Sequence, residues 1–200
     1  MEENSVFGEN AENKKAKNEG PTMLHEIFEW VQAIVVAVVL AMFLRTYVFT
    51  LVNVSGQSMV PTLHNSDKLI VWRLGYEPKT GDIITFRPRG HEDTPYIKRV
   101  IATAGQTVDL KYNEETDSCD VYVDGKKLDE DYIEAKIDKM HMGDMDFPAT
   151  VPENCVFAMG DNRNNSKDSR FMDVGMVTTE SIIGHATFRL LPFGDLGKLD

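Results

Sequence analysis

The chain has 200 residues, of which 42% are hydrophobic and 26% charged, enough for one globular domain of ordinary size and an apolar anchor. Its net charge of -11 at pH 7 opposes binding to a phosphate backbone, so we expect no nucleic-acid partner. Two cysteines are too few for a disulfide framework and the five histidines lack the spacing of zinc ligands, so we expect neither a metal nor another cofactor.

Residues 1–22 are polar, with five glutamates and three lysines, and they end at Gly20-Pro21. A segment of this composition buries too little apolar surface to offset the entropy lost on ordering. We therefore expect a disordered tail.

An apolar segment follows the tail, with an unbroken apolar run from Ala33 to Leu44. We interpret residues 23–47 as a transmembrane anchor helix, while a cleaved signal peptide, a buried helix and a helix lying in the membrane interface are competing interpretations. Lysines precede the segment, and Arg45 alone closely follows it. The positive-inside rule then predicts a single pass through the cell membrane, with the amino terminus cytoplasmic and the body of the protein outside.

Residues 48–200 have the pattern of a mainly β domain. Short segments rich in β-branched residues are bounded by Gly, Pro and charged turns, and they cover residues 68–72, 81–86, 95–102 and 107–112. The dipeptide Asp124-Gly125 between strand-like flanks predicts a hairpin over residues 121–128.

Two features of this domain leave alternatives open. Cys119 and Cys155 could form a bridge outside the cell, or both could be buried thiols. Residues 129–152 have no clear period and several methionines. Such a segment is either an ordinary surface excursion or a surface that touches lipid or an apolar peptide.

Ser58 lies in a segment where a serine can act as a nucleophile. The segment runs Ser-Gly-Gln-Ser-Met-Val-Pro from Ser55 to Pro61, and Pro61 excludes the middle of a helix or of a central strand. Most serines in such turns only satisfy nearby backbone groups. A second element is needed before Ser58 counts as a nucleophile.

Lys98 is that second element. The alternation of a strand over residues 96–102 places its side chains on two faces, with Tyr96, Lys98, Val100 and Ala102 on one and Ile97, Arg99 and Ile101 on the other. A lysine in a strand that is apolar on both faces is partly buried, and desolvation lowers the pKa of its amine from about 10.4. A neutral amine can accept the proton of a serine hydroxyl, so a Ser–Lys dyad needs no histidine.

Four segments, in the same order, resemble the sequence boxes of the type I signal peptidases. Residues 55–63 resemble that family's nucleophile box, residues 81–86 its strand box, residues 98–100 its lysine box and residues 159–170 its last box. The tail over residues 182–193 is similar to the family's closing strand. After the lysine box the family often has Gly-x-Pro-Gly-Asp, where this chain has Ala-Thr-Ala-Gly-Gln.

The resemblance implies an extracytoplasmic domain of antiparallel strands and hairpins behind one amino-terminal transmembrane helix. It implies a membrane-bound serine endopeptidase that removes amino-terminal signal peptides from secreted precursors, after a small-x-small sequence. Ser58 would be the nucleophile that forms an acyl-enzyme, and Lys98 the general base. The implied partners are signal peptides of translocated preproteins and membrane lipid.

The same match assigns the supporting residues. The oxyanion would be held by the backbone N–H of Ser58. Some members place a second hydroxyl two residues before the nucleophile, where this chain has Gly56, so the further donor would be a backbone N–H of this turn, such as that of Gly56, or water. Ser166 would hydrogen-bond the Lys98 amine and aim it at Ser58. Met59 would help to wall a substrate pocket. The loop would be braced by Asp161, Asp168 and Arg170.

Two other functions compete with this interpretation. Another Ser–Lys protease, such as a self-cleaving repressor, would need a DNA-binding domain or a cytosolic partner. A membrane-tethered binding module or an inactive relative would have Ser58 and Lys98 far apart, or both solvated. The distance between these two side chains therefore separates an enzyme from a binding module.

Overall fold

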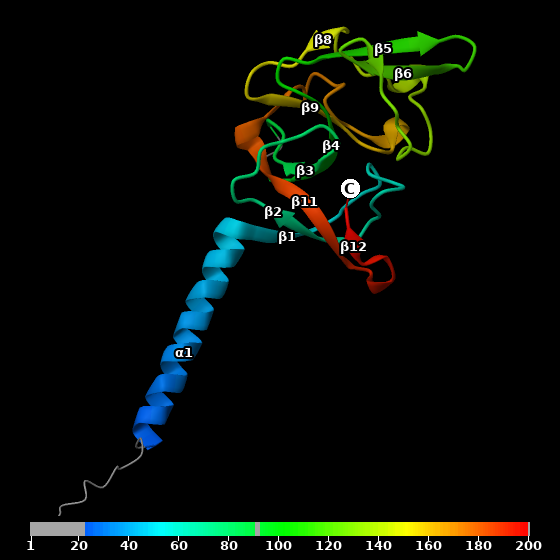
Figure 1. Ribbon diagram of the computed structural model, residues 1–200. Helices are drawn as coiled ribbons and strands as arrows, with labels where there is room; N and C mark the ends of the chain where they lie inside the picture. The colour runs from blue at the N-terminus through cyan, green and yellow to red at the C-terminus, as the bar shows by residue number, and fades with distance from the viewer. Residues whose placement is uncertain (1–22, 91–92, 200) are drawn as a thin grey trace, which may run out of the picture. The chain divides into compact units, whose positions relative to one another are not determined.

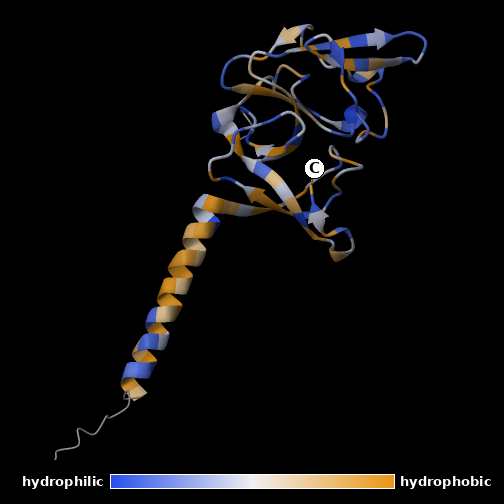
Figure 2. Ribbon diagram, viewed as in Figure 1, coloured by the Kyte–Doolittle hydropathy of each residue, from blue (hydrophilic) through white to orange (hydrophobic). Residues whose placement is uncertain are grey.

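The computed structural model describes residues 23–90 and 93–199, so the tail expected over residues 1–22 lies outside the described residues. Helix α1 (Met23–Phe43) is followed by a π-helical turn, η1 (Leu44–Val48). Every side chain of α1 is exposed, and most of them are apolar (Figure 2). The 26 residues from Met23 to Val48 form a helix long and apolar enough to cross a membrane. At about 1.5 Å per residue they exceed the ~30 Å hydrocarbon core, so the helix fits a single span.

The second compact unit begins at Phe43 and is mainly β, as expected. All strand pairs of its two sheets are antiparallel (Figure 1). The larger sheet has the order β1-β2-β11-β3-β4-β9-β10, with β12 beside β11, and the smaller has the order β7-β6-β5-β8. The strands of the larger sheet are β1 (Phe49–Asn53), β2 (Lys68–Trp72), β3 (Ile83–Phe86), β4 (Tyr96–Thr103), β9 (Cys155–Met159), β10 (Val177–Thr178), β11 (Ile182–Leu191) and β12 (Gly197–Lys198). Those of the smaller sheet are β5 (Thr107–Asn113), β6 (Ser118–Val123), β7 (Lys126–Lys127) and β8 (Ala149–Thr150).

The strands predicted from the sequence correspond to β2, β3, β4 and β5. The predicted hairpin is also confirmed, since Asp124 and Gly125 have φ of 52° and 77° and join Val123 to its partner Lys126. Two positive φ values in a row match the twist of a two-residue hairpin turn. Four short 3₁₀ turns complete the unit: η2 (Lys139–His141), η3 (Arg163–Asn165), η4 (Thr179–Ser181) and η5 (Phe193–Asp195).

The two-face prediction for β4 holds only as far as Val100. The register against β9 shifts between Val100 and Ala102, so β4 carries one more residue than its partner there. Beyond this bulge, Ile101 and Ala102 both pack into the core cluster beneath the smaller sheet. A β-bulge interrupts the period of two, so Ala102 does not continue the face of Lys98.

Residues 129–152 are not an ordinary surface excursion. Ile137 is fully buried, and Met142, Met145 and Phe147 pack against the core cluster that also holds Phe157. The segment therefore covers part of the hydrophobic core. The sequence did not predict this, because the contacts are made by single residues and not by the face of a helix or strand, so they produce no periodic pattern.

Both cysteines are free thiols. Cys119 is buried in β6, and Cys155 is half-buried at the start of β9. Of the two alternatives from the sequence, the structure has unbridged thiols.

Gly184 of β11 lies close against the backbone of β2. A Cβ built there would lie 2.2 Å from the carbonyl oxygen of Trp72, which is backbone and cannot turn away. We predict that Gly184→Ala lowers the free energy of unfolding by at least about 2 kcal/mol, because the strands must separate to admit the methyl group. Gly194→Ala is the matched control, since nothing lies within 4 Å of its Cβ position. Chemical denaturation of both variants checks the prediction, and equal stabilities would contradict it.

Candidate active site

Ser58 lies in the long turn that joins β1 to β2. Backbone hydrogen bonds from Val54 to Asp67 (2.8 Å) and from Ser66 to Val54 (2.9 Å) close the base of this turn. Met59 is 2% exposed and packs into the core, so its side chain anchors the turn from below. The adjacent Ser58 is left half-buried at the surface.

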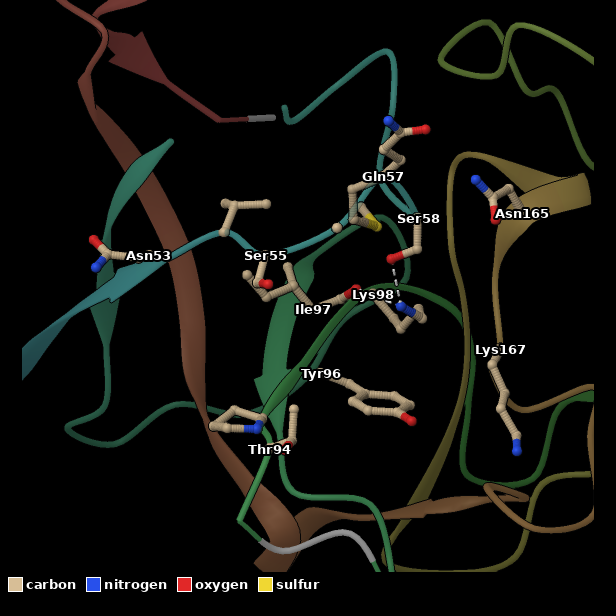
Figure 3. Close-up of a pocket in the computed structure, with 14 residues that line it drawn as sticks. Asn53, Ser55, Gln57, Ser58, Thr94, Tyr96, Ile97, Lys98, Asn165 and Lys167 are labelled. Carbon is tan, nitrogen blue, oxygen red and sulfur yellow. Dashed lines mark hydrogen bonds between the residues drawn. The ribbon is translucent and has the colours of Figure 1, made fainter. Parts of the chain in front are cut away.

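Lys98 lies at the middle of β4, between β3 and β9, and only 3% of it is exposed. Its Nζ is 2.7 Å from Ser58 Oγ and also donates to the carbonyl oxygen of Ile97 at 3.0 Å. Figure 3 shows the two side chains pointing at one another. The structure thus brings together two residues that are 40 positions apart in the chain.

Burial lowers the pKa of Lys98 to about 8. The carboxylates of Asp168 and Asp161 act in the opposite direction, while the Arg170 guanidinium adds to the lowering. At a pKa of about 8, roughly one amine in ten is neutral at pH 7, against one in a few thousand for a solvated lysine. A base of this strength can remove a proton from a serine hydroxyl near neutral pH.

A cleft of about 250 Å³ lies beside the dyad. Its walls are the end of β1 with the following turn on one side and the start of β4 on the other, and Met59 contributes to its lining. Asn165 and Lys167 reach it from a separate segment (Figure 3). The cleft is therefore bordered by two stretches of backbone, residues 53–57 and 94–97, and is also lined by Ser58.

Asp168 and Arg170 form a buried ion pair, and both are 0% exposed. Arg170 donates to the carboxylate through Nε (2.8 Å) and Nη2 (2.9 Å), and the Gly160 N–H donates to it at 2.9 Å. Burial works to raise the pKa of Asp168, but the hydrogen bond and charge of Arg170 hold it below its usual range. The carboxylate is thus kept charged and fixes the loop that carries Ser166.

The expected hydrogen bond between Ser166 and the Lys98 amine is not formed among the described residues. Ser166 Oγ instead donates to Asp168 Oδ2 at 2.6 Å. A hydroxyl has one hydrogen, and here a charged buried carboxylate accepts it, so Ser166 does not donate to the amine of Lys98. A Cβ at Gly160 would come within 2.3 Å of Ser166 Oγ and 2.4 Å of the Ser58 carbonyl oxygen, so the loop packs directly on the nucleophile's backbone.

Asp161 is fully buried and accepts hydrogen bonds both from β4 and from the turn that carries Ser58. Arg99 donates to its two oxygens from Nε (3.0 Å) and Nη2 (2.9 Å), and the Thr62 hydroxyl donates to Oδ2 at 2.5 Å. The N–H of the next residue, Asn162, donates to the Ser58 carbonyl oxygen at 3.0 Å. The sequence analysis gave no role to Arg99 or Thr62, although an arginine inside an apolar strand is a signal that it has a buried carboxylate partner.

The two backbone N–H groups predicted to hold the oxyanion differ in whether another group of the protein already accepts from them. Gly56, with φ of +91°, donates its N–H to Asn65 Oδ1 at 3.1 Å, so its donor is already engaged and the prediction for Gly56 lacks support. The Ser58 N–H has no acceptor within the part of the chain that the structure describes. Of these two N–H groups, only that of Ser58 is without an acceptor among the described residues.

A serine hydroxyl in contact with a buried, weakly basic amine beside an open cleft has the features of a serine hydrolase. Within residues 23–90 and 93–199, no three His, Cys, Asp or Glu side chains come together as a metal site.

Residues 27–191 match the family described as signal peptidase, peptidase S26, and the chain belongs to this family. It is 38% identical to signal peptidase I S of Bacillus subtilis over 191 residues, covering 91% of this chain and 98% of the relative. It is 37% identical to signal peptidase I of Leptolyngbya laminosa over 183 residues, covering 86% and 84%. The crystal structure of a signal peptidase I from Enterococcus faecalis is 31% identical and superposes with a TM-score of 0.44, covering 56% of this chain and 98% of that one.

Removing one partner of the buried Asp168–Arg170 pair tests how much the pair contributes to the stability of the fold. We predict that Asp168→Asn lowers the free energy of unfolding by about 3–5 kcal/mol at pH 7, because Arg170 is left buried without its counter-charge. The pKa of Asp168 is lower in the folded state, so its stabilisation is present above the unfolded pKa of about 3.9 and is lost as the pH falls through the folded value. The difference between variant and wild type should therefore shrink in acid.

Chemical denaturation at pH 7 and pH 3 measures this difference. Asp109→Asn is the control, because the Asp109–Lys111 pair is partly exposed with Nζ 3.7 Å from the carboxylate. A loss at pH 7 no larger than that of the control would contradict the prediction.

Proposed function

We propose that this chain is a membrane-bound serine endopeptidase that removes amino-terminal signal peptides from secreted precursors, with Ser58 as nucleophile and Lys98 as general base. The observation that carries the proposal is the 2.7 Å contact between Ser58 Oγ and an amine that is 3% exposed. Membership of the signal peptidase family supports the substrate class.

The reaction begins when the neutral amine of Lys98 takes the proton of Ser58 Oγ as that oxygen attacks the scissile carbonyl carbon. The tetrahedral intermediate places its negative oxygen near the Ser58 N–H, a preformed donor worth a few kcal/mol in such sites. Lys98 then gives the proton to the leaving amine, and the C–N bond breaks to leave a Ser58 ester. A water molecule, deprotonated by Lys98, attacks this ester and frees Ser58.

The substrate would bind as an extended strand in the cleft between residues 53–57 and 94–97. Backbone hydrogen bonds would supply much of the affinity, and alternate side chains would point into the cleft. The cleft has a volume of about 250 Å³, and Met59 is part of its lining. Membership of the signal peptidase family supports cleavage after a small-x-small sequence.

The proposed arrangement in the cell membrane has residues 23–47 as the anchor, the amino terminus in the cytoplasm and residues 48–200 outside. It is supported by one apolar helix of sufficient length and by the lysines that precede it. An anchor this close to Ser58 in the chain raises the local concentration of the enzyme at the membrane where precursors emerge. A separated or solvated dyad would have favoured the binding-module alternative, and the contact between Ser58 and the buried Lys98 amine supports the enzyme instead.

Ser58→Ala and Lys98→Met test the dyad. We predict that each lowers cleavage of a preprotein by detergent-solubilised full-length protein by at least about 1,000-fold, because the nucleophile and its base act as one unit. Lys126→Met, at an exposed lysine in β7, should retain wild-type activity. Circular dichroism confirms that the variants fold. Cleavage by Ser58→Ala at the wild-type rate would contradict the mechanism.

The pH dependence of the reaction tests the base. Activity requires neutral Lys98, whose pKa is lowered to about 8, so kcat/KM should rise with pH and level off above a midpoint near 8. A midpoint near 10, the pKa of a lysine in water, would mean that burial does not lower the pKa of this amine. Initial rates on a peptide substrate from pH 6 to pH 10.5 measure the midpoint.

A further inference from the structure

Tyr132 and Glu130 lie in the segment after β7, far along the chain from both Ser58 and Lys98, and match none of the four sequence boxes. The structure nevertheless packs them against the base of the active site. Glu130 forms an ion pair with Arg163 Nη1, with side chains 10% and 0% exposed respectively. Tyr132 is linked to both, accepting from Arg163 Nη2 and donating to Glu130 Oε1, each at 3.4 Å.

The ring of Tyr132 contacts two buried guanidinium groups. Arg99 Cζ lies 4.2 Å from the ring centroid and Arg163 Cζ lies 5.8 Å from it. Both distances are within the ~6 Å reach of a cation–π interaction, which strengthens when the cation is desolvated. Tyr132 thus holds together two arginines, one from β4 and one from η3.

These two arginines border the dyad. Arg99 follows Lys98 directly in β4 and binds Asp161, while Arg163 Nε donates to the Gly160 carbonyl oxygen at 3.0 Å. Gly160 and Asp161 belong to the loop that packs on the backbone of Ser58. Movement of either arginine would therefore displace the loop against which the nucleophile rests.

We propose that Tyr132 and Glu130 are positioning residues of the hydrolytic reaction, which hold Arg99 and Arg163 so that Lys98 stays buried and aligned with Ser58. This inference rests on the proposed function of the Ser58–Lys98 dyad. Neither residue touches the dyad, so both act through the arginines.

The groups that set the ionisation of Lys98 determine what the test should show. Burial is the largest influence, the charges near it are Asp168, Arg170 and Asp161, and the Tyr96 ring lies 5.2 Å from Nζ. Loosened packing admits water to the amine and raises its pKa toward the ordinary value. A positioning role therefore predicts a shift of the pH profile, which a loss of stability alone does not produce.

The experiment measures kcat and KM for a signal-peptide substrate from pH 6 to pH 10.5 with detergent-solubilised full-length protein. Tyr132→Leu should lower kcat at pH 7.5 by about 10- to 100-fold, leave KM within about three-fold and move the kcat midpoint upward by at least about half a pH unit. Tyr132→Phe keeps the ring and should stay within about three-fold of wild type. Glu130→Gln should shift the midpoint in the same direction as Tyr132→Leu.

Tyr122→Leu and Glu134→Gln are matched controls. Tyr122 is half-buried and has its own cation–π contact, with Lys111 at 4.6 Å, away from the dyad, and Glu134 is exposed on the same segment as Glu130. Both should keep the wild-type midpoint. Thermal unfolding of every variant identifies any that does not fold. If Tyr132→Leu does not fold, the pH midpoints of Glu130→Gln and Tyr132→Phe test the positioning role in its place.

Unchanged midpoints for Tyr132→Leu and Glu130→Gln, with Ser58→Ala inactive, would overturn the positioning role alone. Activity of Ser58→Ala would instead remove the proposed function on which the inference rests. The two failures are thus distinguishable within one set of measurements.

Discussion

The arrangement of this protein depends on keeping the amine of Lys98 out of water while it touches Ser58. Desolvation lowers the pKa of a lysine, so that more of the amine is neutral near pH 7 and able to accept a proton. The fold meets this requirement by placing Lys98 in β4, which has β3 on one side and β9 on the other. The turn between β1 and β2, which carries Ser58, then covers the amine.

A site built on a buried amine needs a rigid surrounding, and here buried ion pairs supply it. Arg99, Arg163 and Arg170 are each almost fully buried, and each faces a carboxylate, Asp161, Glu130 and Asp168 in turn. The loop from Gly160 to Arg170 has little regular structure, so these contacts hold it in place of a strand ladder. Removing any one partner leaves a charge buried without compensation, which is costly. Precise alignment of the dyad is thereby linked to the stability of the folded chain.

The sequence was sufficient for the parts of the site that depend on local pattern. Ser58 was found from the chemistry of its turn, Lys98 from the alternation of β4, and the hairpin at Asp124 from its turn dipeptide. The same pattern failed at Ala102, because a bulge is decided by the partner strand and leaves no trace in the period of one strand.

The remaining errors concern choices among competing partners. Ser166 had both an amine and a carboxylate within its loop's reach, and the carboxylate accepts its hydroxyl hydrogen in the fold. Gly56 was expected to offer its backbone N–H to the oxyanion, but the side chain of Asn65 in the same turn accepts that N–H. Tyr132 lies in a segment without periodicity, so only tertiary structure reveals that its ring contacts Arg99.

The measurement that tests the account most directly is the titration of Lys98 itself. Competitive labelling of lysine amines with a small acylating reagent, followed by peptide mass spectrometry, gives the reactivity of each lysine as a function of pH. We predict that Lys98 titrates near pH 8, below the value of about 10.4 for a lysine in water. If Lys98 titrated near the value of a lysine in water, the amine would not be the desolvated base on which the proposed mechanism depends.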